Sequence, residues 1–177
     1  KVPESFTFKG VTYTPKSFAA SLGINPDDYI EITSFTHFPF YTRGILENPD
    51  NWTMEKFYNV PLEELIEIMD FALKSGYTVN WDGDISEEGF SHSKGVAILP
   101  EILNVDDNKT TDPSQQGKIL PPEFSDEVFK FLKPFPEIKV TQDMRQKGYE
   151  NFTTTDDHLM HITGIVIDQL GTKYYVT

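Results

Sequence analysis

Two histidines near the end of the sequence, His158 and His161, have the residue type and spacing best suited to chemistry. Imidazole exchanges protons near neutral pH and is a common metal ligand. Histidines three residues apart share one face of a helix and could bind one ion, but on a strand they point to opposite sides. Residues 158–167 are β-branched and contain one glycine, which predicts a strand. We therefore expect no shared metal ion and no cofactor.

A second candidate for chemistry is a set of acidic residues, Asp82, Asp84 and Glu87, with a similar set at residues 106–112. In both sets, the spacing of the oxygen-bearing side chains loosely resembles that of a calcium-binding loop. Neither has the glycine at position 6 and the glutamate at position 12 that an EF-hand loop requires. We interpret both as solvated turns.

The composition excludes several classes of protein. The 177 residues contain no cysteine, so the chain has no disulfide, no thiolate metal site and no thiol nucleophile of its own. A net charge of −13, from 15 basic and 28 acidic residues, argues against a nucleic-acid partner. Apolar runs such as residues 162–167 are too short to cross a membrane. The sequence starts at Lys1 without a signal peptide and is expected to be part of a longer precursor, cytoplasmic or exported.

The clearest element in the sequence is a helix over residues 62–74. Apolar residues recur there with helical spacing, Pro61 suits the start, and Gly76 suits the end. Residues 77–82 follow as an alternating strand, so we expect the helix and the strand to pack as two layers. Further helices are predicted at residues 14–22, 125–132 and 141–147, further strands at 28–35, 95–99, 158–167 and 172–177, and an exposed loop at 104–122. These elements predict a single α+β domain over residues 1–177.

Two features of the middle of the chain leave alternatives open. The aromatic residues Phe35, Phe38, Phe40 and Tyr41 could line a groove, but core packing is the favoured interpretation. Pro39 makes residues 37–41 an edge strand or a loop.

The sequence also contains three glycosylation sequons, which matter only if the chain enters a glycosylating compartment: Asn51, Asn108 and Asn151.

The sequence around His158 resembles a known family. Residues 157–165 read Asp-His-Leu-Met-His-Ile-Thr-Gly-Ile, and residues 172–176 read Thr-Lys-Tyr-Tyr-Val. This is similar to the segment around the catalytic histidine of the aminopeptidase C and bleomycin hydrolase family, which are papain-like cysteine peptidases. The family typically has Asp/Thr-His-Ala-Met there, which aligns its catalytic histidine with His158.

Two further stretches resemble the same family in the same order along the chain. Residues 14–18 and 27–30 are similar to its Thr-Pro-x-x-Phe helix and Asp-Asp-Tyr strand. Residues 58–65 and 75–81 resemble its Asn-x-Pro-x-Glu helix and the strand that follows. The matches span most of residues 5–177, and the loop at 104–122 looks like an insertion. The resemblance implies the right-hand lobe of a papain-like peptidase, an antiparallel β-barrel-like sheet with peripheral helices.

The resemblance also implies a role for His158. In such an enzyme this imidazole takes the proton of a cysteine thiol and later protonates the departing amine, while an asparagine orients the ring. His161 would be structural, and Asp157 would have no catalytic role. The cysteine and the oxyanion-hole glutamine would come from a missing N-terminal lobe, the asparagine would follow Thr177, and the family's C-terminal arm is also missing. The chain alone is therefore expected to be inactive.

Two functions follow from these observations. The preferred one is a fragment of a cysteine aminopeptidase, which hydrolyses peptide bonds at the N-termini of peptide substrates. The alternative, motivated by the missing cysteine, is a non-catalytic acidic binding module on a peptidase-derived scaffold. The expected partners are peptide substrates and the N-terminal lobe, and the family's hexamers make a homo-oligomer a further expectation. A strand edge at residues 172–177 should favour such association.

Overall fold

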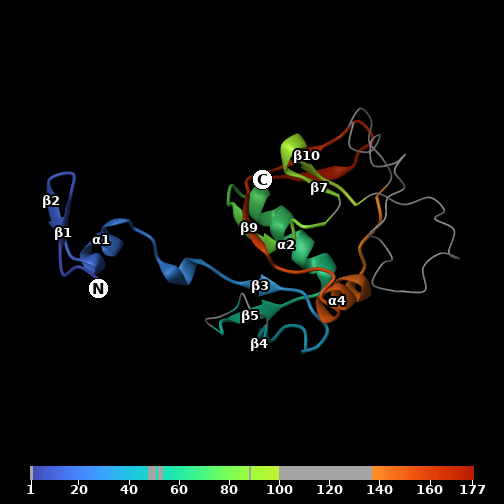
Figure 1. Ribbon diagram of the computed structural model, residues 1–177, viewed down its shortest axis with the longest axis horizontal. Helices are drawn as coiled ribbons and strands as arrows, with labels where there is room; N and C mark the ends of the chain where they lie inside the picture. Colours follow the sequence, from blue (N-terminus) through green and yellow to red (C-terminus); the bar gives the residue numbers. More distant parts are fainter. Residues whose placement is uncertain (1, 48–50, 52–53, 88, 100–136) are drawn as a thin grey trace, which may run out of the picture. The chain divides into compact units, whose positions relative to one another are not determined.

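The computed structural model describes residues 2–47, 51, 54–87, 89–99 and 137–177 (Figure 1). The chain forms two compact units, Lys1–Glu31 and Ile32–Thr177, which we describe separately. The described residues contain three α-helices and five small sheets, so the fold is mixed α and β. These sheets do not close into a barrel, and none of the helices among the described residues is long and apolar enough to span a membrane.

The first unit is a hairpin followed by a short helix. Strands β1 (Phe6–Phe8) and β2 (Val11–Tyr13) pair antiparallel, and α1 (Pro15–Ser21) follows. The predicted helix at residues 14–22 is confirmed, because Thr14 caps α1 by accepting a hydrogen bond from the backbone N–H of Ser17. The rings of Phe6 and Tyr13 each lie 5.3 Å from that of Phe18. This aromatic cluster holds the unit together.

The predicted strand at residues 28–35 is wrong over most of its length. A short 3-10 helix, η1 (Pro26–Asp28), precedes β3, which covers only Ile32–Thr33. Asn25 caps η1 with its side chain, and Pro26 fixes the backbone for a helical turn, so the chain becomes extended later than its β-branched residues suggest.

The second unit contains one three-stranded sheet, in the order β3-β5-β4 (Figure 1). Strand β5 (Lys56–Asn59) lies in the centre, parallel to β3 and antiparallel to β4 (Arg43–Ile45). The parallel pair differs from the purely antiparallel sheet that the sequence suggested. It arises because β3 and β5 are connected through β4 rather than through a hairpin.

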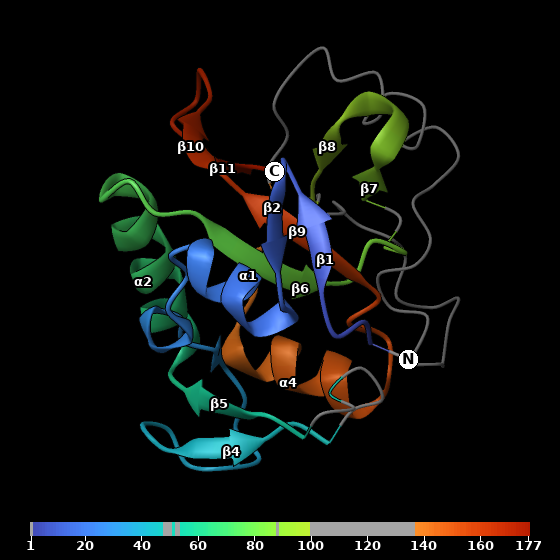
Figure 2. The ribbon, with the colours of Figure 1, turned by 90° about the vertical axis from the view of Figure 1, so that its left-hand side faces the viewer.

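Helix α2 (Leu62–Lys74) confirms the clearest sequence prediction. It begins after Pro61, carries Glu63 and Glu64 in its first turn, and ends before Gly76, which has a φ of +86°. The helix contacts β6 (Val79–Gly83), as expected for two packed layers, and Figure 2 shows both elements side by side.

The predicted strand at residues 158–167 is two strands with different partners. Strand β9 (His158–Ile162) pairs antiparallel with β6, whereas β10 (Gly164–Ile167) pairs antiparallel with β11 (Lys173–Val176). The change occurs at Thr163, whose backbone N–H donates to the carbonyl oxygen of Val176 at 2.7 Å. The predicted turn between the last two strands is confirmed, because Asp168 accepts hydrogen bonds from the backbone N–H groups of Leu170 and Thr172.

The remaining elements are short. Strands β7 (Phe90–Ser91) and β8 (Val96–Ala97) flank the 3-10 helix η2 (His92–Lys94), so only part of the predicted strand at 95–99 forms. Helix α4 (Gln142–Glu150) begins after its predicted cap, Thr141, but continues past Gly148. This glycine allows close packing, since a Cβ there would lie 2.8 Å from Oγ1 of Thr154. The predicted loop at 104–122 and helix at 125–132 lie outside the described residues.

Candidate functional site

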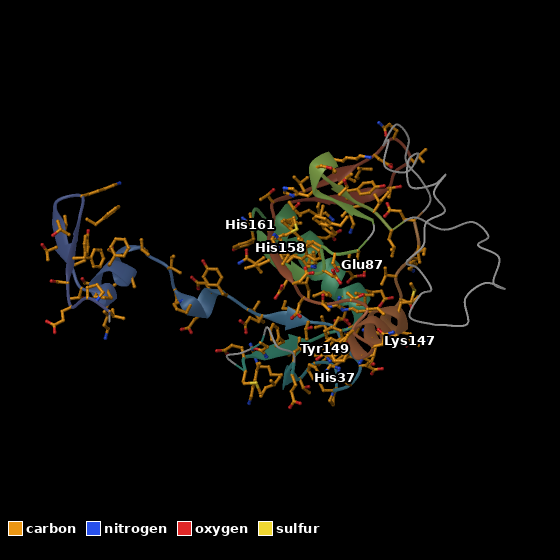
Figure 3. The ribbon with its side chains drawn as sticks, viewed as in Figure 1. His37, Glu87, Lys147, Tyr149, His158 and His161 are labelled. Atoms are coloured by element: carbon orange, nitrogen blue, oxygen red, sulfur yellow. The ribbon has the colours of Figure 1, made fainter. Side chains whose placement is uncertain are left out.

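The first candidate site lies at the start of β9, where His158 is exposed to solvent. His158 pairs with Gly83, while His161 pairs with Asn80. Residues three apart on a strand point to opposite faces, so the two histidines are separated as the sequence predicted. Figure 3 labels both of them.

The surroundings of His158 on its own face of the sheet combine an open backbone with an aromatic surface. Gly83, its cross-strand partner, has no side chain. The indole of Trp81 covers this glycine, because a Cβ there would lie only 2.1 Å from Cζ2 of Trp81. Trp81 and Gly83 are two residues apart on β6, so the indole and the imidazole lie on the same face. An exposed imidazole beside an apolar ring is therefore available to a partner.

The backbone at His158 is fixed by contacts between the end of β6 and the residues before β9. The N–H of Asp157 donates to the carbonyl oxygen of Gly83, and the N–H of Ile85 donates to Oδ1 of Asp157, each at 3.1 Å. Oδ2 of Asp84 accepts a hydrogen bond from the N–H of Thr155 at 2.9 Å. These bonds tie both segments together immediately before His158, and they engage the Asp157 carboxylate in a structural role.

Asp84 is the buried part of this connection, with 9% of its surface exposed. Its Oδ1 accepts hydrogen bonds from both the N–H and the hydroxyl of Ser86. Burial alone would raise the pKa of Asp84, but the hydrogen bonds from Ser86 and Thr155 outweigh it, and the pKa is lowered. The interpretation of this segment as a solvated turn is therefore wrong for Asp84, whose oxygens are used inside the protein.

The calcium-like pattern does not form a metal site in the part of the chain that the structure describes. Asp82 lies on the exposed face of β6, opposite Leu159, and Glu87 accepts a hydrogen bond from the hydroxyl of Thr154 at 3.3 Å. The described residues contain no group of three or more histidines and acids that could hold an ion. The second set, at residues 106–112, lies outside the described residues.

A second candidate site, which we call the His37 pocket, is an open pocket of about 450 Å³. His37 and Tyr149 stack in it, with their ring centroids 5.3 Å apart and their planes within 2° of parallel. Figure 3 shows both residues in a part of the unit away from His158 and His161. The pocket is lined by His37, Phe38, Gly44, Ile45, Glu47 and Tyr149.

Two buried amide side chains position the rings of the His37 pocket. Asn59 is completely buried; its Nδ2 donates to the carbonyl oxygens of Phe35 and Phe38, and its Oδ1 accepts from the N–H of Phe35. Gln146, on α4, accepts from the N–H of Thr36 at 2.6 Å. The loop that carries His37 is therefore held from both sides.

The orientation of Gln146 also fixes the roles of the ring nitrogens of His37. Because Oε1 of Gln146 accepts from Thr36, its Nε2 is the atom that donates to Glu150 at 2.9 Å. The same Nε2 lies 3.3 Å from Nδ1 of His37, which must then act as an acceptor. Gln146 therefore orients the imidazole of His37 through its Nδ1 edge.

The aromatic cluster predicted from the sequence is divided between core and pocket. Phe35 is buried and packs against Tyr149 and the guanidinium of Arg145, whose pKa burial lowers. Phe38 lines the pocket, and the exposed Tyr41 donates a hydrogen bond to Glu64. Residues 37–41 are a loop, as Pro39 allowed. Core packing was thus the correct interpretation for Phe35 and the groove for Phe38.

Gln146 and Tyr149 were not among the site residues expected from the sequence. Part of the signal was available, because Gln142 and Gln146 have helical spacing within the predicted helix at residues 141–147. Tyr149 follows on the same face, but it lies beyond the predicted end of that helix at Gly148. That face is mostly polar, so a search for apolar periodicity does not select it.

Comparison with known proteins gives no family assignment. No protein-family model and no curated protein matches this chain. The function has to be inferred from the residues of the two candidate sites.

Proposed function

We propose that this chain is the histidine-bearing lobe of a papain-like cysteine aminopeptidase, similar to the aminopeptidase C and bleomycin hydrolase family, and that His158 is its general base. The observation that carries the proposal is an exposed imidazole on a paired strand, held by backbone contacts on its N-terminal side. A general base has to meet its partner in a fixed position while remaining accessible to it.

The proposed reaction requires a thiol from other polypeptide, because these 177 residues contain no cysteine. His158 would take the proton of that thiol, and the sulfur would attack the carbonyl carbon of the N-terminal peptide bond. The resulting imidazolium would protonate the departing amine as the carbon–nitrogen bond breaks. His158 would then deprotonate a water molecule, whose oxygen displaces the sulfur and releases the amino acid, and the proton would return to the sulfur.

The surroundings of His158 are compatible with a second lobe. The Trp81 indole lies on the same face of the β6–β9 pair as His158. Leu159, the next residue on β9, is 65% exposed on the opposite face. An apolar side chain next to an exposed polar group is common where another chain or lobe packs. In the proposed peptidase, this chain is the papain-like right-hand lobe, and a cysteine-bearing N-terminal lobe packs against it near His158. The proposed substrates are peptides with a free N-terminus.

The test is peptidase activity of the complete reading frame that encodes these residues. It should hydrolyse aminoacyl-coumarylamide substrates in a reaction that thiol-alkylating reagents abolish. The His158→Ala variant should lose at least about 10³-fold in kcat, because removing one member of such a catalytic unit disables all of it. His161→Ala, on the opposite face of the same strand, is the matched control and should stay within a few-fold of the parent.

The second candidate, a non-catalytic acidic binding module, is favoured by the absence of cysteine from the sequence. A reading frame without any cysteine-bearing lobe would support the module and exclude the peptidase. Activity that survives the His158→Ala change, or that alkylation does not affect, would also contradict the peptidase proposal.

A further inference from the structure

We propose that the His37 pocket binds an organic cation, namely an ammonium group carried on a short aryl or alkyl stem. This goes beyond the proposed peptidase function and does not depend on it, because the pocket and His158 are separate sites (Figure 3). Its volume of about 450 Å³ lies in the range of small-molecule sites.

The apolar part of the pocket fits the stem of such a ligand. The ring of Phe38 packs closely on the backbone of Gly44, where a Cβ would lie only 2.5 Å from Cδ2 of Phe38. The same ring meets His37 edge to face, with the centroids 5.0 Å apart. Phe38 and Ile45 therefore present a fixed hydrocarbon surface next to the stacked rings of His37 and Tyr149.

The charge of the pocket selects a cation. Glu47 is exposed at the pocket, and no lysine or arginine lines it among the described residues. Burial, together with the negative charges of Asp156 and Glu47, raises the pKa of Tyr149. The hydroxyl of Tyr149 therefore stays protonated, and so uncharged, next to these carboxylates. Carboxylates and aromatic rings both attract an ammonium ion.

The site is organised before a ligand arrives. Asn59 fixes the loop of His37 and Phe38 through buried hydrogen bonds, and Gln146 fixes the orientation of the His37 ring. Binding therefore does not have to order these rings, which reduces its entropic cost. Among the described residues that line the pocket, Glu47 alone carries a formal negative charge, so it is the residue expected to distinguish a cation from a neutral molecule of the same shape.

The test compares three probes of nearly equal size on the complete 177-residue chain: 2-phenylethylammonium, 2-phenylethanol and 3-phenylpropionate. Binding is measured by NMR titration of the backbone amides. The ammonium probe should bind with a Kd of about 1–10 mM and shift the Gly44 and Ile45 amides. The alcohol should bind at least about 5-fold more weakly, and the carboxylate should not bind measurably.

The variant Glu47→Gln should reduce the affinity for the ammonium probe to that for the alcohol. The matched control is Glu67→Gln, which removes the same charge from an exposed position on α2 and should leave both affinities unchanged. A second variant, Phe38→Leu, should weaken both probes. Equal binding of the ammonium and the alcohol, an effect of Glu67→Gln as large as that of Glu47→Gln, or the absence of shifts at residues 44–45 would overturn the proposal.

Discussion

At the scale of single residues, the carboxylate of Asp70 connects two elements that are far apart in the sequence. It accepts hydrogen bonds from Nζ of Lys173 at 2.8 Å, from the hydroxyl of Tyr175 at 2.7 Å and from Nζ of Lys74 at 3.3 Å. These bonds link α2 to β11. The hydrogen bond from Lys173, followed by those from Tyr175 and Lys74, lowers the pKa of Asp70 to about 2 despite its partial burial.

Replacement of Asp70 by Asn should therefore reduce stability in a pH-dependent way. The pKa of Asp70 is lower in the folded state than its ordinary value of 3.8, so its contribution is present above pH 3.8 and is lost as the pH falls through about 2. We expect Asp70→Asn to cost about 1 kcal/mol at pH 7, allowing for solvent screening. Urea unfolding of both proteins at a series of pH values measures this difference. If the difference in the free energy of unfolding between the two proteins persisted unchanged below pH 2, it would not come from the ionised carboxylate of Asp70.

At the scale of elements, the β6–β9 pair depends on a glycine that is needed for space. Gly83 and Gly164 both lie in strands at negative φ, but only Gly83 is covered by a side chain. A Cβ at Gly83 would overlap the indole of Trp81, whereas at Gly164 the nearest atoms, on Val176, are 3.9 Å away. The two positions form a matched pair.

The variant Gly83→Ala should displace the Trp81 indole and destabilise the protein by about 1–3 kcal/mol, because an extra carbon in a packed contact forces neighbouring atoms to move. Gly164→Ala should be within about 0.5 kcal/mol of the parent. Chemical denaturation gives the stabilities, and the indole resonances in NMR spectra report the displacement. Similar stabilities for the two variants would show that the indole moves without cost.

The elements also show what the sequence could and could not predict. Helix α2 was predictable because its apolar spacing, its proline and its glycine are all local signals. The division of residues 158–167 into β9 and β10 was not, because it is set by the distant partners β6 and β11. His158 is a candidate because of its residue type, and the role proposed for it comes from a family resemblance. The His37 pocket combines residues 37, 47 and 149, which no local pattern connects.

At the scale of the whole molecule, the chain consists of two units, and the residues of both candidate sites belong to Ile32–Thr177. The first unit has its own cluster of Phe6, Tyr13 and Phe18. The second unit has a separate set of buried apolar residues, which includes Phe35, Leu46, Val60 and Ile162. Each unit therefore has its own cluster of packed apolar side chains.

Deletion of residues 1–31 should leave the remaining unit folded. We expect the midpoint of thermal unfolding to change by less than about 4 °C, which corresponds to about 1 kcal/mol for a domain of this size. Amide spectra of residues 32–177 should retain their dispersion. Loss of the cooperative transition on deletion would show that the second unit depends on the first.

The buried side chain of Asn51 has a consequence for how the protein can be produced. Asn51 is 8% exposed, its Nδ2 donates to the carbonyl oxygens of Leu46 and Glu55, and its Oδ1 accepts from the N–H of Glu55. This nitrogen is also the atom to which an oligosaccharide would be attached in the Asn51 sequon. A eukaryotic secretory host that glycosylates the nascent chain at Asn51 would block these bonds. Protein with these hydrogen bonds intact is therefore best produced in a bacterial cytoplasm, or from a sequence in which the sequon is removed by substitution of Thr53.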